Sequence, residues 1–167
     1  MERLNLDDIA TLQQAAERLK GQVDVLAIDP PFNTGSFQFK DEGDSHQIWA
    51  DYMRERLIAI KPMLKEDAFL FIAIDDREFA QLKLLCDEIF GESRFKKLLE
   101  TRPRPHFWKT GVNTGRCFHQ YILCYCLDES LFFEPTVKGR LDQVMDYLMD
   151  EQQAVKEDAV MVKASRI

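Results

Sequence analysis

Residues 23–35, with the sequence Val-Asp-Val-Leu-Ala-Ile-Asp-Pro-Pro-Phe-Asn-Thr-Gly, constrain the fold more than any other stretch. An apolar run rich in β-branched residues ends at a carboxylate, two prolines, an aromatic ring and a loop closed by glycine. The pattern predicts a buried strand over residues 23–28, which stops because proline cannot donate a ladder hydrogen bond. Ligands of open α/β sheets bind beyond the carboxyl ends of the strands, so Asp29 to Phe32 form the candidate site.

Helical periodicity alternates with apolar runs along the N-terminal half of the chain. Apolar residues recur every three to four positions in three segments, 5–20, 45–60 and 79–90. A second continuous apolar run, residues 68–74, precedes the third of these segments. Strand, helix, strand and helix in this order predict an α/β fold with a parallel sheet and right-handed crossovers.

Polar residues near the starts of these segments are the expected helix caps. Asn5 is placed to cap the first helix and Ser45 the second, and Gly21 follows the end of the first. Asp75 and Glu78 come directly after the second apolar run and have the spacing of a capping box. The sequence therefore predicts that both acids serve the start of the third helix.

The second half of the chain predicts two further strands and a terminal helix. Residues 94–101 and 118–126 are the expected strands, and they are joined by a long loop without a helix, which favours an antiparallel pair. An apolar stripe that starts near Val137 predicts a C-terminal helix. Beyond Asp150 the stripe weakens, which is typical of a surface or partner-facing helix or of a frayed end.

Composition indicates one compact soluble domain, expected over residues 1–135, with residues 136–167 as a helix or tail: 46% of the 167 residues are hydrophobic and 31% are charged. No apolar run approaches the roughly 20 residues that cross a bilayer, and the N-terminus lacks a signal-peptide pattern, so a cytoplasmic protein is expected. Four cysteines without C-x-x-C spacing favour buried thiols over a metal site. They are Cys86, Cys117, Cys124 and Cys126.

The net charge of -7 argues against a nucleic-acid-binding protein, since phosphate contacts need clustered cations. The distribution of charge, however, is uneven. Residues 94–116 contain seven Lys and Arg residues and a single acid, a local charge of +6, which leaves -13 for the rest of the chain. This basic segment can still contact a polyanion.

Five segments together resemble the DNA adenine-N6 methyltransferases, most closely the methylation subunits of type III restriction-modification systems. They occur in the order and at the spacing of that family. The first is Asp-Pro-Pro-Phe-Asn-Thr-Gly at residues 29–35, and the second is Trp49 with Met53, Arg56 and Leu57. The others are Phe-Ile-Ala-Ile-Asp-Asp at 71–76, Leu-Leu-Cys-Asp-Glu-Ile-Phe-Gly-Glu at 84–92, and His-Gln-Tyr-Ile-Leu at 119–123.

The resemblance implies S-adenosylmethionine as cofactor, but one family motif is missing. In the family group with this motif order, a later strand carries a Phe-x-Gly-x-Gly turn that holds the cofactor. None of the seven glycines here forms a G-x-G pair. The resemblance therefore implies a partial Rossmann-like methyltransferase sheet, the catalytic half, with an antiparallel strand pair and a C-terminal helix. Most of the cofactor site is not encoded, as expected of a truncated, split or decayed methyltransferase.

The resemblance also assigns roles to the candidate residues. The carboxylate of Asp29 and the backbone carbonyl of Pro30 would accept the two amine hydrogens of adenine, and Pro31 would fix the backbone. The base must first leave the duplex, and the ring of Phe32 would stack on it. Asn33, Thr34 and Gly35 either close the turn or lie beside substrate and cofactor.

The loop in the basic segment is the expected DNA-binding surface. Its aromatic rings either stack on bases or pack as a hydrophobic loop. The candidate DNA-binding residues are Arg102, Arg104, Phe107, Trp108 and Lys109.

Two functions remain open from the sequence. The first is a DNA adenine-N6 methyltransferase, or the catalytic part of one, which transfers a methyl group from S-adenosylmethionine to a flipped-out adenine. The alternative is a catalytically inactive remnant that binds DNA or a partner, and cytosine-N4 transfer also remains open. A homodimer, or a second chain that supplies the cofactor-binding strands, is expected, because the strand at 23–28 would otherwise present an open edge.

Overall fold

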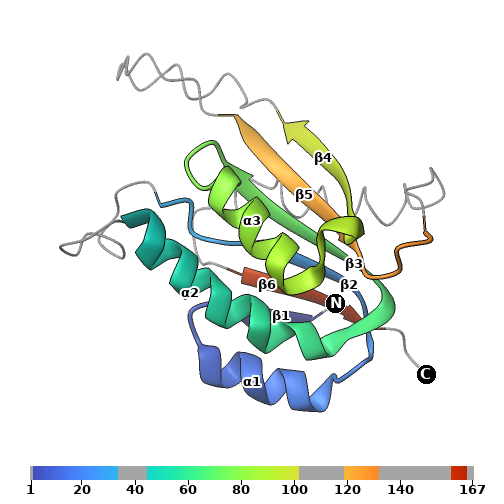
Figure 1. Cartoon of the computed structure of the whole chain (residues 1–167). Helices are drawn as coiled ribbons and strands as arrows, with labels where there is room; N and C mark the ends of the chain where they lie inside the picture. Colours follow the sequence, from blue (N-terminus) through green and yellow to red (C-terminus); the bar gives the residue numbers. More distant parts are fainter. Residues whose placement is uncertain (1, 34–44, 102–118, 132–158, 165–167) are drawn as a thin grey trace.

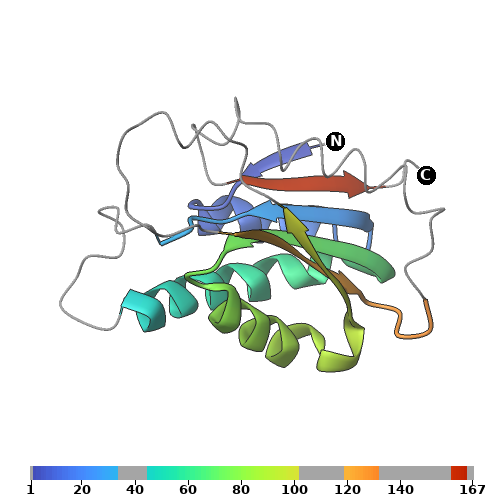
Figure 2. The same cartoon turned by 90° about the horizontal axis from the view of Figure 1, so that it is seen from above.

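The computed structural model describes residues 2–33, 45–101, 119–131 and 159–164. Its strands form a six-stranded sheet, with helices α2 and α3 over one face and α1 beside α2 (Figures 1 and 2). From one edge to the other, the strands are β1 (Glu2–Asn5), β6 (Ala159–Ala164), β2 (Val23–Asp29), β3 (Leu64–Asp75), β5 (Gln120–Cys126) and β4 (Phe95–Thr101).

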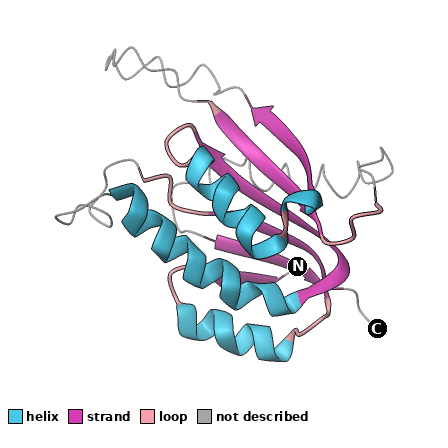
Figure 3. Cartoon of the chain, viewed as in Figure 1, coloured by secondary structure: helices cyan, strands magenta, loops and turns pink. Residues whose placement is uncertain are grey.

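The sheet is mixed, as Figure 3 shows. β2 and β3 are parallel, with Ile28 opposite Ile72, and the other neighbouring strands are antiparallel. The predicted parallel pair and the predicted antiparallel pair, β4 with β5, are both confirmed. The chain therefore has the expected α/β fold with a partial Rossmann-like sheet.

The helices confirm most of the expected boundaries. They are α1 (Ile9–Arg18), α2 (Ser45–Ile60) and α3 (Phe79–Phe90), with short 3-10 helices η2 (Lys61–Met63) and η3 (Glu92–Arg94). None of the helices in the described part of the chain is long and apolar enough to span a membrane.

The expected start of the first helix is wrong. Asn5 is the last residue of β1, and α1 is capped by Asp8, whose Oδ1 accepts a hydrogen bond from the backbone N–H of Thr11 at 3.0 Å. Asn5 instead accepts a hydrogen bond from the backbone N–H of Asp7. Two residues capable of capping lie close together here, and the chain uses the second because Glu2–Asn5 pairs with β6.

The expected state of the C-terminal tail is also wrong where the structure describes it. Residues 159–164, expected to be helical or frayed, form β6, which lies between β1 and β2. Their sequence, Ala-Val-Met-Val-Lys-Ala, suits a strand, because β-branched residues fit a pleated surface. β2 is therefore not an edge strand, and the open edge expected at residues 23–28 does not exist. The helix expected from residue 137 and the boundary at residue 135 lie outside the described residues.

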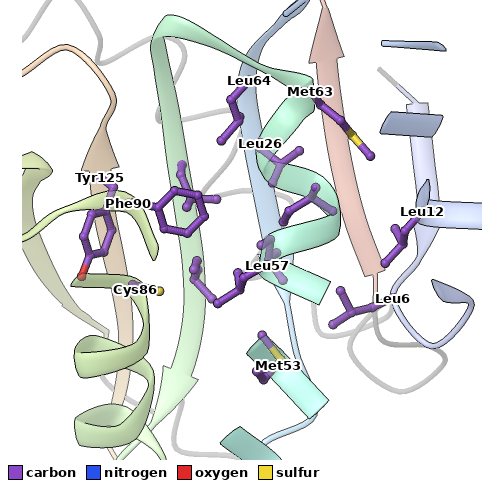
Figure 4. Close-up of a cluster of buried hydrophobic side chains, with 14 of the residues drawn as sticks. Leu6, Leu12, Leu26, Met53, Leu57, Met63, Leu64, Cys86, Phe90 and Tyr125 are labelled. Atoms are coloured by element: carbon purple, nitrogen blue, oxygen red, sulfur yellow. The ribbon is translucent and has the colours of Figure 1, made fainter. Parts of the chain in front are cut away.

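Alternating residues of β2 pack into two hydrophobic clusters on opposite faces of the sheet. Leu26 and Ile28 belong to the larger cluster, which includes the buried sides of the helices. Val25 and Ala27 belong to the smaller one. Figure 4 shows Leu26 of β2 and Leu57 of α2 among the side chains of the larger cluster. This burial on both faces explains why the β2 sequence is a continuous apolar run.

The expected buried thiols are confirmed for three of the four cysteines. Cys86, Cys124 and Cys126 are free and buried, and Cys117 lies outside the described residues. Burial raises the pKa of Cys124 to about 12, since a thiolate is disfavoured away from water. These thiols are therefore inert core residues.

Candidate active site

The candidate site lies where the two parallel strands end. β2 ends at Asp29 and its neighbour β3 ends at Asp75, so both acids lie at the carboxyl edge of the sheet. Asp29 is partly exposed, and the chain continues through a buried Pro30 and a partly buried Pro31. Two successive residues without an N–H end the ladder, which places the Asp29 carboxylate at the sheet edge.

Helix α2 fixes the backbone directly after the prolines. Trp49 is fully buried, and its indole Nε1 donates a hydrogen bond to the backbone carbonyl of Pro31 at 2.6 Å. This hydrogen bond to the candidate site was not predicted from the sequence. The Pro31 carbonyl is therefore engaged within the protein.

Phe32 occupies the boundary between the two hydrophobic clusters. Its ring is partly buried and packs against both of them. Phe32 follows Asp29 by three positions in the sequence. An aromatic surface of this kind can stack on a planar ligand while its inner edge stays packed.

Asn33 closes the stretch in a left-handed backbone conformation, with φ of 49°. Asn is one of the few residues that adopt this conformation readily. Its side-chain Nδ2 donates to the backbone carbonyl of Ser45 at 3.3 Å and to Oε1 of Glu78 at 2.5 Å. The same Oε1 contacts Nδ1 of His46 at 2.7 Å. Three elements thus meet at Asn33: the loop after β2, the first turn of α2 and the start of α3.

The expected capping box at Asp75 and Glu78 is wrong. Glu78 is the N-cap residue of α3, but its side chain makes no capping hydrogen bond. Its carboxylate is fully buried and contacts Asn33 and His46 instead. Asp75 accepts a hydrogen bond from the backbone N–H of Arg77 and pairs with the Arg77 guanidinium at 2.8 Å. Burial raises the pKa of Asp75, against the opposing effect of Arg77.

Asp76, in the same turn, contacts the start of β5. Its carboxylate accepts hydrogen bonds from the backbone N–H of His119 and from the Tyr121 hydroxyl, each at 2.7 Å. Partial burial acts to raise the pKa of Asp76, but these hydrogen bonds lower it on balance. The hydrogen bond to Asp76 raises the pKa of Tyr121 to about 12. The turn after β3 therefore contacts both the residues that follow β2 and the start of β5, the two strands that flank β3.

Comparison with known proteins identifies the family. The family model N6_N4_Mtase, described as DNA methylase, matches residues 23–155, which include β2, the candidate site and β3 to β5. The chain belongs to this family of DNA methylases.

Individual relatives of this chain agree with that assignment. The type II methyltransferase M.KpnI of Klebsiella pneumoniae is 37% identical over 153 residues, covering 83% of this chain and 36% of the relative. The StyLTI Mod subunit of Salmonella typhimurium, from a type III restriction-modification enzyme, is 33% identical over 118 residues, 53% of this chain and 18% of the relative. The EcoP15I Mod subunit of Escherichia coli is 28% identical over 154 residues, 71% of this chain and 23% of the relative. This chain therefore spans less than two-fifths of the length of each of these relatives.

A solved structure from Thermus thermophilus, that of a protein provisionally assigned as a DNA modification methylase, aligns with a TM-score of 0.48 and 15% identity. The alignment covers 78% of this chain and 55% of that chain.

The structure describes part of the predicted site. Asp29, Pro30, Pro31, Phe32 and Asn33 form one continuous stretch at the carboxyl edge of β2. The other predicted site residues lie outside the described part of the chain. They are Thr34, Gly35, Arg102, Arg104, Phe107, Trp108 and Lys109.

Sequence reasoning missed the residues that contact this stretch from α2 and from the start of α3. Glu78 was assigned to a helix start, and His46 was not singled out. Glu78 contacts Asn33, which is 45 positions earlier in the sequence, and His46, which is 32 positions earlier. One signal was available for Glu78: it follows a strand that ends at the candidate site.

Proposed function

We propose that this chain carries the base-binding and catalytic part of a DNA adenine-N6 methyltransferase. S-adenosylmethionine supplies the methyl group, and a flipped-out adenine receives it. The observation that carries the proposal is the Asp29-Pro-Pro-Phe stretch, which follows a buried parallel strand and is bonded to α2 through Trp49 and Pro31. Family membership supports the same reaction class.

The exocyclic amine of adenine is a poor nucleophile, because its lone pair is delocalised into the ring. In the proposed reaction, the Asp29 carboxylate and the Pro30 carbonyl accept hydrogen bonds from the two N–H groups of the amine. These hydrogen bonds direct the nitrogen lone pair towards the methyl donor. Phe32 stacks on the extruded base and returns part of the cost of unstacking it. The Trp49 hydrogen bond favours this arrangement, since it fixes the backbone one residue after Pro30.

The first residue of the motif favours adenine over cytosine. The related motif of cytosine-N4 methyltransferases usually begins with Ser, whereas this chain has Asp29. A carboxylate is the stronger hydrogen-bond acceptor for an amine. Cytosine-N4 transfer is the outcome that the substrate test below must distinguish.

The described residues do not make a complete site for S-adenosylmethionine. The described glycines, Gly21 and Gly91, precede β2 and follow α3, so neither provides a turn at the carboxyl end of a strand. The sequence also lacks a G-x-G pair. We therefore propose that most of the cofactor site comes from polypeptide outside these 167 residues, such as a second chain, because a second copy of the same sequence would lack the same glycine turn. The pairing of β2 with β6 removes the open edge as an argument for this association, which now depends on the missing glycine turn.

The alternative function is a catalytically inactive module that binds DNA or a partner, which the basic segment 94–116 favours. Two of its described cations are already bonded within the chain. Arg94 donates to the carbonyl of Phe90, and Lys96 donates to the carbonyl of Glu129. DNA contacts are therefore expected from the cations at 102–116.

The test is single-turnover transfer of labelled methyl groups to duplex DNA, with 2-aminopurine at the target base to report flipping. It is run with the chain alone and with the chain mixed with the proposed second chain that completes the cofactor site. We expect Asp29→Ala to abolish transfer and to leave DNA binding within about threefold, because Asp29 acts on a base that has already left the duplex. Phe32→Ala should also weaken capture of the flipped base, by roughly 1 to 3 kcal/mol of stacking.

The matched control is Asp24→Asn. Asp24 is an acid of the same strand and pairs with Lys65 at 2.8 Å, but it lies near the amino end of β2. It should transfer methyl groups at the wild-type rate. Near-normal transfer by Asp29→Ala, or no transfer by wild type in any assembly, would contradict the catalytic assignment and favour the binding module.

A further inference from the structure

Glu78 is a buried acid at the start of α3, and helix capping does not explain why an acid is buried there. It is the N-cap residue of α3, yet its side chain accepts no capping hydrogen bond, and its exposed fraction is 0%. A buried carboxylate is costly unless specific donors compensate for the lost water. One oxygen, Oε1, has such donors, and the other, Oε2, has no hydrogen-bond partner among the described residues.

The contacts of Oε1 lie on both sides of residues 34–44. Asn33, which directly precedes that segment, donates from Nδ2 at 2.5 Å. His46, in the first turn of α2, contacts the same oxygen through Nδ1 at 2.7 Å. Asn33 also donates to the carbonyl of Ser45 at 3.3 Å, so the two ends of the segment are joined directly and through Glu78.

These contacts determine the conformation of the candidate catalytic stretch. Asn33 has a positive φ of 49°, which its side-chain bonds to Glu78 and Ser45 help to retain. The peptide before Asn33 carries Phe32, and Pro31 is fixed on its other side by Trp49. Without Glu78, the stretch from Asp29 to Asn33 would keep the Trp49 bond and the 3.3 Å bond from Asn33 to the Ser45 carbonyl, but it would lose its side-chain contact with the start of α3.

We propose that Glu78 is a positioning residue for base capture and methyl transfer, which acts through Asn33 on the Asp29–Phe32 stretch. This inference rests on the proposed function for its catalytic consequence. The role is geometric: the carboxylate acts as an acceptor for Asn33 and His46, and it does not exchange a proton with the substrate. Gln keeps an Oε1 acceptor in the same place, so the charge itself is dispensable.

The experiment compares Glu78→Ala, Glu78→Gln and Glu88→Gln in the assembly used for methyl transfer. Glu88 is the matched control, because it is an acid of the same helix that pairs with Arg54 of α2 but is exposed. We expect Glu78→Ala to lower single-turnover transfer by about 100-fold, as a small displacement of reacting groups can. Glu78→Gln and Glu88→Gln should stay within about threefold of wild type, on the same scale of positional effects.

A second readout needs neither cofactor nor DNA. The indole N–H of Trp49 is bonded to the Pro31 carbonyl, so its hydrogen exchange, followed by NMR, reports whether the stretch stays in place. Its resonance is assigned by its loss in Trp49→Phe. Exchange should accelerate in Glu78→Ala and not in the two Gln variants. Denaturant unfolding gives the global stability of each variant, and exchange rates are compared under conditions where these stabilities are equal. If Glu78→Ala fails to fold, Asn33→Gly removes the same contact while tolerating the positive φ, and it should accelerate exchange likewise.

The outcomes separate the proposals. Equal loss of transfer in Glu78→Ala and Glu78→Gln, with unchanged Trp49 exchange, would indicate a charge-dependent chemical role and overturn positioning. Wild-type behaviour of Glu78→Ala in both readouts would also overturn it. If wild type shows no transfer, the proposed function fails, and Trp49 exchange still decides whether Glu78 positions the stretch.

Discussion

The hydrogen bond between Trp49 and Pro31 provides a test of how α2 supports the site. Trp49→Phe removes the Nε1 donor and part of the ring while keeping an aromatic side chain in a fully buried position. Loss of one hydrogen bond costs about 0.5 to 1.5 kcal/mol. The void left by the smaller ring adds about 1 kcal/mol. We therefore expect the free energy of unfolding to fall by about 2 kcal/mol, which lowers the Tm by about 4 to 8 °C for a chain of this size.

The functional effect should exceed what this loss of stability explains. At a temperature where the variant is folded, release of the Pro31 carbonyl should lower single-turnover transfer by about 10- to 100-fold. Unfolding is followed by circular dichroism, because the substitution removes one of the two tryptophans. Leu57→Ala is the control: Leu57 is equally buried on α2 and is packed in the large cluster. It should cost about 3 to 5 kcal/mol and leave transfer by the folded protein unchanged.

A transfer defect in Leu57→Ala that matches or exceeds that of Trp49→Phe would refute this reasoning. It would mean that activity follows the stability of α2 and not the contact at Pro31. A loss of stability below about 0.5 kcal/mol in Trp49→Phe would show instead that solvent replaces the indole donor without cost.

Three further predictions concern other parts of the chain. The hydrogen bond to Asp76 raises the pKa of Tyr121 from 10.0 to about 12, so the neutral hydroxyl stabilises the fold fully below pH 10, and this contribution is lost as the pH rises through 12. In Asp76→Asn, tyrosinate absorbance, with Tyr121→Phe as the reference, should show the pKa of Tyr121 moving back towards 10. Reversal of Arg102 and Arg104 to Glu should weaken DNA binding and reduce its salt slope by about 2, measured by fluorescence anisotropy, and an unchanged slope would put the DNA surface elsewhere. Deletion of residues 159–167 removes the strand between β1 and β2, so the shortened chain should self-associate in light scattering, whereas a stable monomer would contradict the pairing of β6 with β2.

Local patterns in the sequence were sufficient for the central elements of the fold. β2 and residues 68–74 of β3 are mostly apolar because both of their faces are buried, and α2 has apolar residues at helical spacing because one side packs on the sheet. The antiparallel pair of β4 and β5 was predicted because the sequence between the two strands indicates a loop and not a helix. In these cases the local sequence and the tertiary environment favour the same structure.

The failures occur where a distant partner decides the structure. β1 and β6 are short, and they pair with each other from opposite ends of the chain, with Glu2 opposite Val162. No local window contains both strands. The same holds for Asn33 and Glu78, which are 45 positions apart. Asp29 to Phe32 could be singled out because motif and strand end are contiguous, whereas the residues that hold them could not.

The turn between β3 and α3 illustrates how a local interpretation can hide a functional one. Asp75 and Glu78 have the spacing of a capping box, yet Glu78, the N-cap residue, makes no side-chain capping hydrogen bond, and Asp75 bonds to Arg77. Glu78 contacts residues on both sides of 34–44, and Asp76 accepts a hydrogen bond from His119, the first described residue after 102–118. Those two segments contain the candidate residues beside the base and the candidate DNA-binding residues. Because Asp76 and Glu78 belong to one short turn, a displacement of that turn moves the contacts of both residues together. A substitution there therefore alters the candidate site directly, even though the helix start keeps its backbone hydrogen bonds.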